Sequence, residues 1–424
     1  MLSIDYIREN KDKVITAAKN KGYKQIDIPK LLSIDEDRKK LDQEIQQLRQ
    51  DLNLLSKKGI DDASKEKNKQ TRILIQQKEK ELNEINKQYK ILLNEIPNIP
   101  EDDVPLGEDE SKNKVIKTWG KPNKFDFKPK DHLELGESLD IIDVKTASKV
   151  SGSRFGYLKN EAVILEFALV QLAINTLIKE GFQPIIPPVL INKNITEDLG
   201  YWNGGGNEDY YLVHEPENKD NGFYLIGTAE HSLVPMHKNE ILFKKNLPKR
   251  YVGFSTAFRR EAGSYGKDVR GIFRVHQFDK VEMVSFVTKE EDAKEHKFML
   301  ELEEKLFQIL EIPYQVVQMC TGDLGFPIAK KYDIEAWFPS QNKFREVTSV
   351  STTTDFQSRR LNIKYQDGQK KEFVHILNGT AFAIGRTIIA ILENFQQKDG
   401  SVQIPKALHK YTGFTKISKK NSNL

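Results

Sequence analysis

The chain has 424 residues, which is enough for two or three domains with cores of their own. Apolar residues make up 38% and charged residues 30% of the sequence, and this composition excludes a disordered chain. The net charge of +4 excludes a histone-like polycation. Cys320 is the single cysteine, so a disulfide framework within the chain and a cysteine-rich zinc site are also excluded.

The positive charge is unevenly distributed. Residues 1–100 hold 21 basic and 17 acidic residues, whereas the rest of the chain holds 45 of each. The N-terminus has no apolar signal segment, and no window approaches the roughly 18 uninterrupted apolar residues of a spanning helix. We therefore expect a cytoplasmic protein with no membrane partner, whose excess positive charge lies in its first quarter.

Residues 1–100 contain two amphipathic stretches with the heptad spacing of a coiled coil. The apolar seams are Leu41, Ile45, Leu48, Leu52 and Leu55, then Leu82, Ile85, Tyr89, Leu92 and Ile96. One break at 56–62 separates them, with Gly59 to turn the chain, and Pro97 ends the second helix. The pattern predicts an N-terminal domain over 1–100 with an antiparallel helical hairpin over about 31–96. An acidic linker over 101–114 and a second domain over 115–424 follow.

The second domain mixes helices and strands. The pattern predicts helices over 161–180, 289–311 and 383–395. It predicts an extended segment at a sheet edge over 182–191, which contains three prolines. Strands over 251–258 and 272–287 are joined by a polar, glycine-rich loop, which indicates a hairpin. The prediction is an α+β fold with an antiparallel sheet flanked by helices.

That hairpin carries the most informative chemistry. Arg259 and Glu261 share one face of the first strand, and Arg274, Phe278 and Glu282 share one face of the return strand. Guanidinium groups suit phosphate oxygens, and an aromatic ring suits a purine. Taken singly, each residue is a solvated charge or a core ring; together on paired strands they favour a nucleotide pocket.

No Walker or Rossmann phosphate loop is present, and the run 204–206 (GGG) is either a flexible loop or a phosphate cradle. Residues 258–282 resemble motif 2 of class II aminoacyl-tRNA synthetases, in the form found in the seryl-tRNA synthetase family. Further segments with matching family motifs are 181–188 (motif 1), 227–230 (the serine-binding TxE loop), 320–326 and 332–337 (the central sheet), 345–349 and 354–360 (the metal-ligand strand), and 377–387 (motif 3). The resemblance covers nearly the whole chain, the helical arm included.

The resemblance implies a homodimeric ligase that activates L-serine with ATP and Mg²⁺ to seryl-adenylate. It then transfers the seryl group to the 3′ end of serine tRNA; whether selenocysteine tRNA is also a substrate stays open. The catalytic residues it implies are Arg259 and Arg386. The ATP-binding residues are Arg259, Arg260, Glu261, Arg274, Val275, Phe278, Glu346, Val347, Thr348, Ser349 and Arg386. The serine-binding residues are Thr228, Ala229, Glu230, Glu282 and Thr380.

Within these sets the resemblance assigns Arg259 to the α-phosphate, Phe278 to stacking on adenine with Arg386 on its other side, and Glu230 to the α-amino group. Glu346 and Ser349 would hold the metal, since Mg²⁺ prefers oxygen ligands. Strict strand alternation puts these two on opposite faces, so a shared metal site requires a bulge or bend within 344–350.

The arm is expected to bind the tRNA. Its basic tip residues are Lys57, Lys58, Lys65, Lys67, Lys69 and Arg72. A basic tip suits a phosphate backbone, although many coiled coils only mediate protein contacts. Three other functions remain as alternatives: a ligase that loads a carrier protein, an inactive nucleic-acid-binding paralogue, and a synthetase for another amino acid. His231 and residues 201–210 depart from the family pattern, and we expect His231 to be structural.

Overall fold

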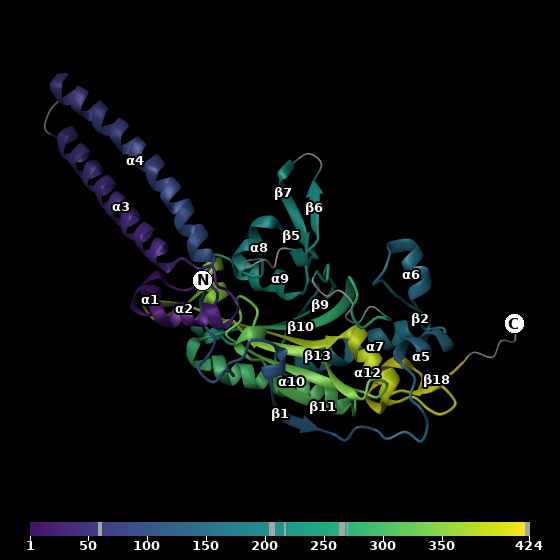
Figure 1. The fold of residues 1–424 in the computed structure, drawn as a ribbon. Helices are drawn as coiled ribbons and strands as arrows, with labels where there is room; N and C mark the ends of the chain where they lie inside the picture. The colour runs from purple at the N-terminus through teal and green to yellow at the C-terminus, as the bar shows by residue number, and fades with distance from the viewer. Residues whose placement is uncertain (58–61, 203–207, 216–217, 263–267, 269, 420–424) are drawn as a thin grey trace. The chain divides into compact units, whose positions relative to one another are not determined.

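The computed structural model describes residues 1–57, 62–202, 208–215, 218–262, 268 and 270–419. The chain divides into two compact units, Met1–Ile99 and Pro100–Leu424. Each unit is built around its own buried residues, and Figure 1 shows the first as helices and the second as a large sheet with helices against it.

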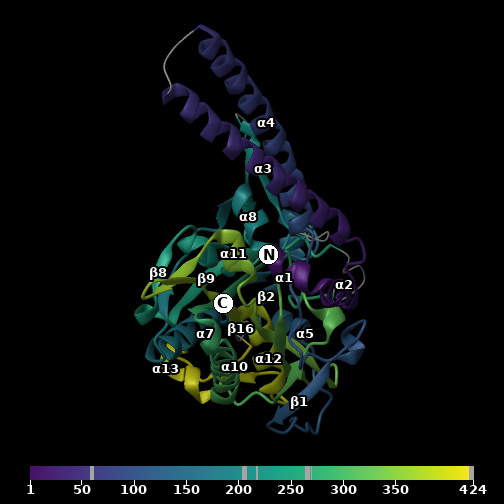
Figure 2. The same ribbon diagram turned by 90° about the vertical axis from the view of Figure 1, so that its left-hand side faces the viewer.

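The first unit consists of four helices: α1 (Ile4–Glu9), α2 (Lys11–Asn20), α3 (Ile28–Lys57) and α4 (Asp62–Asn94). α3 and α4 run side by side in opposite directions, as Figures 1 and 2 both show, which confirms the predicted hairpin. Its first helix begins three residues earlier than expected, and its second ends before Pro97. The glycine turn of the predicted break falls at 58–61, outside the described residues.

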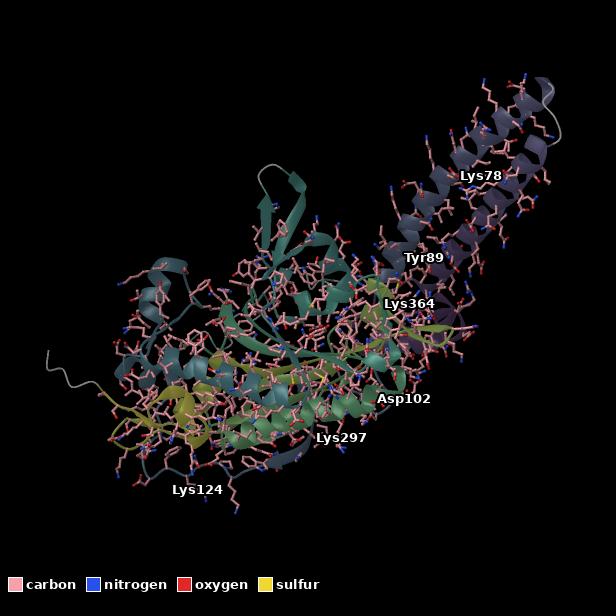
Figure 3. All side chains as sticks on the ribbon, turned by 180° about the vertical axis from the view of Figure 1, so that it is seen from behind. Lys78, Tyr89, Asp102, Lys124, Lys297 and Lys364 are labelled. Atoms are coloured by element: carbon pink, nitrogen blue, oxygen red, sulfur yellow. The ribbon has the colours of Figure 1, made fainter. Side chains whose placement is uncertain are left out.

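The seam between α3 and α4 is apolar near Leu41, Ile45 and Ile75, which are buried. Elsewhere along α4 the two helices are joined by polar contacts. Lys78 and Tyr89, both labelled in Figure 3, belong to these: Lys78 Nζ lies 2.7 Å from Glu44 Oε2, and the Arg38 guanidinium lies 4.7 Å from the Tyr89 ring centre. The hairpin therefore combines a narrow hydrophobic seam with ion pairs, as a coiled coil does.

The second unit contains an eight-stranded sheet in the order β1-β11-β12-β13-β16-β10-β9-β4. Its strands are β1 (Lys114–Trp119), β4 (Gln183–Ile185), β9 (Lys249–Phe258), β10 (Gln277–Val287), β11 (Tyr314–Gln318), β12 (Lys330–Phe338), β13 (Lys343–Thr352) and β16 (His375–Ala383). Neighbours pair antiparallel except β4 with β9. The predicted antiparallel sheet is confirmed, and the proline-rich segment supplies its edge strand β4.

The return strand of the predicted hairpin is shorter than expected. β10 begins at Gln277, so residues 272–276 form turns that lead into the strand and are not part of it. Arg274 lies on this segment, so its position follows from the turns and not from strand alternation.

Three long helices cover one face of the sheet: α7 (Glu161–Lys179), α10 (Asp292–Ile309) and α12 (Ile384–Asn394). Strand residues Val281 and Met283 point into the core that these helices close. Among the described helices, α7 is the one that could span a membrane by length and composition. Its Leu165 and Leu169 are fully buried in this core, whereas Ile164 and Phe167 are exposed.

Shorter elements complete the second unit. The helices are α5 (His132–Ser138), α6 (Val144–Ser151), α8 (Lys193–Leu199), α9 (Glu230–Leu233), α11 (Phe356–Leu361) and α13 (His409–Thr412). The short strands are β2 (Ile142–Asp143) with β3 (Tyr157–Leu158); β5 (Leu190–Asn192), β7 (Asn218–Leu225) and β6 (Leu212–Glu215); β15 (Lys370–Phe373), β14 (Lys364–Asp367) and β8 (Ile241–Phe243); and β17 (Val402–Gln403) with β18 (Lys416–Ile417).

Residues 101–114, expected to be a linker, are packed onto the second unit. Val104 is buried in a small cluster with Val317. Backbone hydrogen bonds join Glu101 N to Ala329 O and Thr321 N to Pro105 O. Lys330 Nζ also pairs with the carboxylates of Glu101 and Asp103, so part of the acidic composition of the segment serves these contacts.

Candidate active site

A cavity of about 260 Å³ is lined by residues of β10, β13 and β16 of the large sheet and by the start of α12. Its lining includes most of the residues expected to bind ATP or serine: Thr228, Glu230, Arg259, Glu261, Arg274, Val275, Phe278, Glu282, Glu346, Val347, Thr348, Ser349, Thr380 and Arg386. Two expected residues lie off the cavity. Ala229 is fully buried in a separate apolar cluster, and Arg260 is not among the lining residues.

The arginine side of the cavity is built at the open end of the β9–β10 hairpin. Arg259 follows β9 directly; its Nε donates to Gly227 O at 3.1 Å, and its guanidinium lies 5.6 Å from the Phe278 ring centre. Glu261 has a left-handed backbone (φ 53°), and its Oε2 accepts a hydrogen bond from Arg274 Nη1 at 2.5 Å. Two guanidiniums and an aromatic ring are thus gathered at one wall, as the sequence predicted.

Gly227 is required by a close approach at the base of this wall. A Cβ at this position would lie 2.6 Å from Cε1 of Tyr210, closer than real Cβ atoms come to other atoms. The Gly227 N–H donates to Nδ1 of His231 at 3.2 Å. Burial lowers the pKa of His231 well below its usual range, and Arg259 and Lys280 lower it further. This imidazole accepts a backbone hydrogen bond and also lines the cavity, so the structural role expected for His231 stays a prediction.

Glu230 is buried and held by two side chains from other elements. Tyr201 Oη donates to both carboxylate oxygens at 2.9 Å, and Gln357 Nε2 donates to Oε1 at 3.0 Å. Burial raises the pKa of Glu230 to about 7; Glu282 adds to the rise, whereas Gln357 and Tyr201 oppose it. The result is a desolvated, oriented carboxylate that suits a small cation.

Glu282 forms a closed polar triangle with two neighbours on the same face of the sheet. Its Oε2 lies 2.6 Å from Lys280 Nζ and accepts a hydrogen bond from Thr380 Oγ1 at 3.0 Å. Lys280 Nζ also donates to Thr380 Oγ1 at 3.3 Å. All three residues are buried. The pairing of β10 with β16 places Glu282 opposite Thr380 and so creates the triangle.

Glu346 and Ser349 lie on β13, where the predicted bulge is confirmed. The register between β12 and β13 shifts at this point: Glu346 pairs with Glu335, but Thr348 pairs with the next residue, Ile334. Val347 is therefore the extra residue, and it points into the helix-side core. Because the bulge resets the alternation, Glu346 and Ser349 both line the cavity.

Arg386, at the start of α12, contacts Glu346 directly. Its Nη1 donates to Glu346 Oε2 at 2.9 Å and to Glu346 O at 3.1 Å, and its guanidinium lies 4.7 Å from the Phe273 ring centre. Desolvation alone would raise the pKa of Glu346, but the charges of Arg386 and Lys331 lower it to about 2. Arg386 thus packs on Phe273, whereas Arg259 is the cation near Phe278.

Several cavity residues were not singled out from the sequence. They include Tyr201, Tyr210, Phe273, Lys280, Lys331 and Asn378. Lys280 could have been found, because the alternation of side chains along a strand places it on the same face as Phe278 and Glu282. Tyr201 and Gln357 had no such signal, because both reach Glu230 from segments distant in sequence.

The expected tRNA-binding residues lie on the first unit. Lys65, Lys67, Lys69 and Arg72 are exposed on α4. Lys57 ends α3, and neither its side chain nor Lys58 is among the described parts of the chain. The glycine run 204–206 also lies outside the described residues.

Known proteins resemble this chain along its whole length. Residues 1–100 match the seryl-tRNA synthetase N-terminal domain, and residues 211–395 match the tRNA synthetase class II core domain (G, H, P, S and T). A serine--tRNA ligase from Dictyoglomus turgidum is 44% identical over 99% of this chain and 100% of its own length.

Solved structures agree in fold. The seryl-tRNA synthetase of Pyrococcus horikoshii, solved with ATP, superposes with a TM-score of 0.91 at 43% identity, covering 99% of this chain and all of that one. The cytoplasmic serine-tRNA ligase of Naegleria fowleri, solved with AMP, gives 0.86 at 30% identity and 99% coverage of both chains. The chain belongs to the seryl-tRNA synthetase family of class II aminoacyl-tRNA synthetases.

Proposed function

We propose that this cavity is where the chain, a serine--tRNA ligase, activates L-serine with ATP and then transfers the seryl group to tRNA. One observation carries the assignment to the cavity: it joins an arginine wall for phosphates to two buried carboxylates, Glu230 and Glu282. An anionic nucleotide and a small zwitterion with a hydroxyl group require these two halves side by side.

In the nucleotide half, Arg259 binds the α-phosphate, where negative charge develops as the serine carboxylate attacks. Phe278 stacks on adenine, and Glu261 accepts a hydrogen bond from the adenine amino group. Arg274 and Arg386 neutralise the remaining phosphate charge. Support comes from the ion pairs Arg274–Glu261 and Arg386–Glu346, which hold both guanidiniums at the cavity before any nucleotide binds.

Glu346 and Ser349 would hold Mg²⁺ in this half. The bulge at Val347 turns both oxygen ligands to the cavity, and oxygen donors suit this hard cation. No cluster of three His, Cys, Asp or Glu side chains suited to a metal occurs in the described part of the chain. Two protein ligands leave room for phosphate oxygens and water. When bound, Mg²⁺ neutralises phosphate charge.

In the amino-acid half, Glu230 pairs with the α-ammonium group of serine, and Glu282 accepts the hydrogen bond of the serine hydroxyl. The burial of both carboxylates supports this assignment. A site built to bond a hydroxyl rejects alanine strongly, whereas threonine must be rejected by fit.

The α3–α4 hairpin binds serine tRNA. The exposed Lys65, Lys67, Lys69 and Arg72 on α4 support this, since clustered cations bind a phosphate backbone. The protein acts as a homodimer in the cytoplasm. Two exposed apolar surfaces support the dimer. One is a face of α7 with Ile164, Phe167 and Ile178, and the other is Ile186, which follows the edge strand β4 and is 85% exposed.

The decisive experiment is ATP–pyrophosphate exchange with each of the twenty amino acids. We expect serine alone to give a strong signal, and a chain that exchanges with another amino acid and not with serine would overturn the proposal. Charging of serine tRNA and of selenocysteine tRNA, measured side by side, then defines the tRNA substrates.

A further inference from the structure

The buried triangle of Lys280, Glu282 and Thr380 contains one residue with no role in the function proposed above. We propose that Lys280 is a specificity-determining positioning residue, which fixes Glu282 so that a single carboxylate oxygen faces the substrate hydroxyl. The inference rests on the proposed serine site and names what makes that site selective.

The hydrogen bonds divide the two oxygens of Glu282 between the protein and the ligand. Oε2 is engaged by Lys280 Nζ at 2.6 Å and by Thr380 Oγ1 at 3.0 Å. Among the described residues, none donates a hydrogen bond to Oε1. Because Glu282 lines the cavity, Oε1 is the acceptor left for a ligand.

The hydroxyl of Thr380 is likewise engaged by hydrogen bonds within the triangle. A threonine hydroxyl has one proton to donate, and Thr380 gives it to Glu282 while accepting from Lys280 at 3.3 Å. Its hydroxyl therefore has no proton left for the substrate. We assign Thr380 to orienting Glu282, and the recognition of the serine hydroxyl falls to Glu282 Oε1.

Lys280 also supplies the charge that this arrangement requires. Glu282 and Glu230 both lie in the cavity wall and are buried, and a desolvated carboxylate without a cation is costly. The Lys280 ammonium is buried too, and Glu282 Oε2 is its nearest carboxylate oxygen. Arg259 is another cation of the cavity wall, and its Nε donates to Gly227 O.

An alanine substrate has no hydroxyl and cannot use Glu282 Oε1. Lys280 should therefore matter for serine and hardly at all for alanine, and this difference separates a specificity role from a general structural one. The test is Lys280→Met, which keeps the length of the side chain and removes the charge. Lys331→Met is the matched control, because Lys331 is another lysine of the cavity wall whose partner is Asp333, not Glu282.

Pyrophosphate exchange is measured with serine and with alanine, at saturating ATP, for each variant. For Lys280→Met we expect kcat/KM for serine to fall roughly 100-fold, alanine exchange to stay within about threefold, and the KM for ATP to be unchanged. Lys331→Met should leave the serine-to-alanine ratio at its wild-type value, whatever it does to the overall rate.

Thr380→Val is a second test of how Glu282 is positioned, and it keeps the lysine charge. It removes one donor to Oε2, so we expect the serine-to-alanine ratio to fall by roughly tenfold, less than for Lys280→Met. Equal losses for serine and alanine in both variants would overturn the inference and leave the proposed function standing. Absence of serine-dependent exchange in the wild-type protein would instead overturn the proposed function, and the inference with it.

Discussion

The helical hairpin and the cavity use charge in opposite ways. Along the hairpin most cations and carboxylates lie at the surface, as in the pair Arg49–Glu79, although Asp35 of α3 is buried. In the cavity wall, Glu230, Glu282 and Lys280 are buried, and each has a specific partner. The sequence-wide net charge hides this contrast, because the cavity charges nearly balance and the surplus lies in the first 100 residues.

Because of this difference, the hairpin and the cavity should respond differently to the substitution of a charged residue. Exposed charges act through their summed field, which salt screens, so single substitutions of exposed charges in the hairpin should matter little. Buried charges act singly and in a low-dielectric surrounding, so one substitution in the cavity should be decisive.

The largest effect is expected at Arg259. Arg259→Ala should lower kcat for serine-dependent pyrophosphate exchange by about 1,000-fold, because the guanidinium that meets the developing phosphate charge is lost. Arg260→Ala is the matched control, since Arg260 is adjacent in sequence but does not line the cavity. We expect it to stay within about threefold of wild type. Equal losses in the two variants would contradict the placement of Arg260.

The second-largest effect is expected on tRNA charging, when several basic residues of the helical hairpin are substituted together. Reversing Lys65, Lys67, Lys69 and Arg72 to Glu should lower kcat/KM for tRNA charging by about 100-fold and flatten its dependence on salt. Pyrophosphate exchange should be unchanged. The control reverses Lys121, Lys124, Lys128 and Lys130, which are exposed on the second unit and give the same change in net charge. A loss of charging in the control alone would place the tRNA elsewhere.

Much of the fold could be predicted from periodicity. Heptads indicated the hairpin, and the apolar helix 161–180 and the strand 251–258 were found nearly in full. The segment 101–114, expected to be a linker, packs against the second unit through backbone hydrogen bonds and through ion pairs of Glu101 and Asp103 with Lys330. The start of the return strand was wrong, because turns replace strand at 272–276 although the residues there suit either.

In the candidate site, too, some contacts could be predicted from the sequence and others could not. The need for a bulge near Val347 could be deduced, since two predicted ligands of one ion had to share a face. The contacts of Glu230 with Tyr201 and Gln357 could not, because they join three segments far apart in the chain. Local pattern identifies which strand faces are polar, and tertiary packing decides which partner each group receives.

A smaller effect is expected from pH. With a pKa of about 7, Glu230 loses its charge as the pH falls through neutrality, so the KM for serine should rise about tenfold between pH 8 and pH 6. Tyr201→Phe removes a donor that stabilises the carboxylate, so the same rise should begin at higher pH. Tyr211→Phe, a tyrosine outside the cavity lining, is the control. Identical profiles for wild type and Tyr201→Phe would contradict the coupling.

The smallest effect is expected for the exposed ion pair of the hairpin. Arg49 Nη2 lies 2.6 Å from Glu79 Oε1, with side chains 60% and 38% exposed. A double-mutant cycle of Arg49→Ala and Glu79→Ala, read from urea unfolding, should give a coupling free energy below about 1 kcal/mol that salt abolishes.

Arg250 and Glu295 provide the matched pair in the second unit. Two guanidinium nitrogens of Arg250 contact the two carboxylate oxygens of Glu295 at 2.6 and 2.7 Å, and Glu295 is buried. Removing Arg250 alone should cost about 3 kcal/mol, because it strands a buried carboxylate, and salt should change this little. If removing Arg250 cost no more than the exposed pair contributes and depended equally on salt, the contrast between hairpin and catalytic unit would have to be abandoned, since burial would then not decide what a charge contributes.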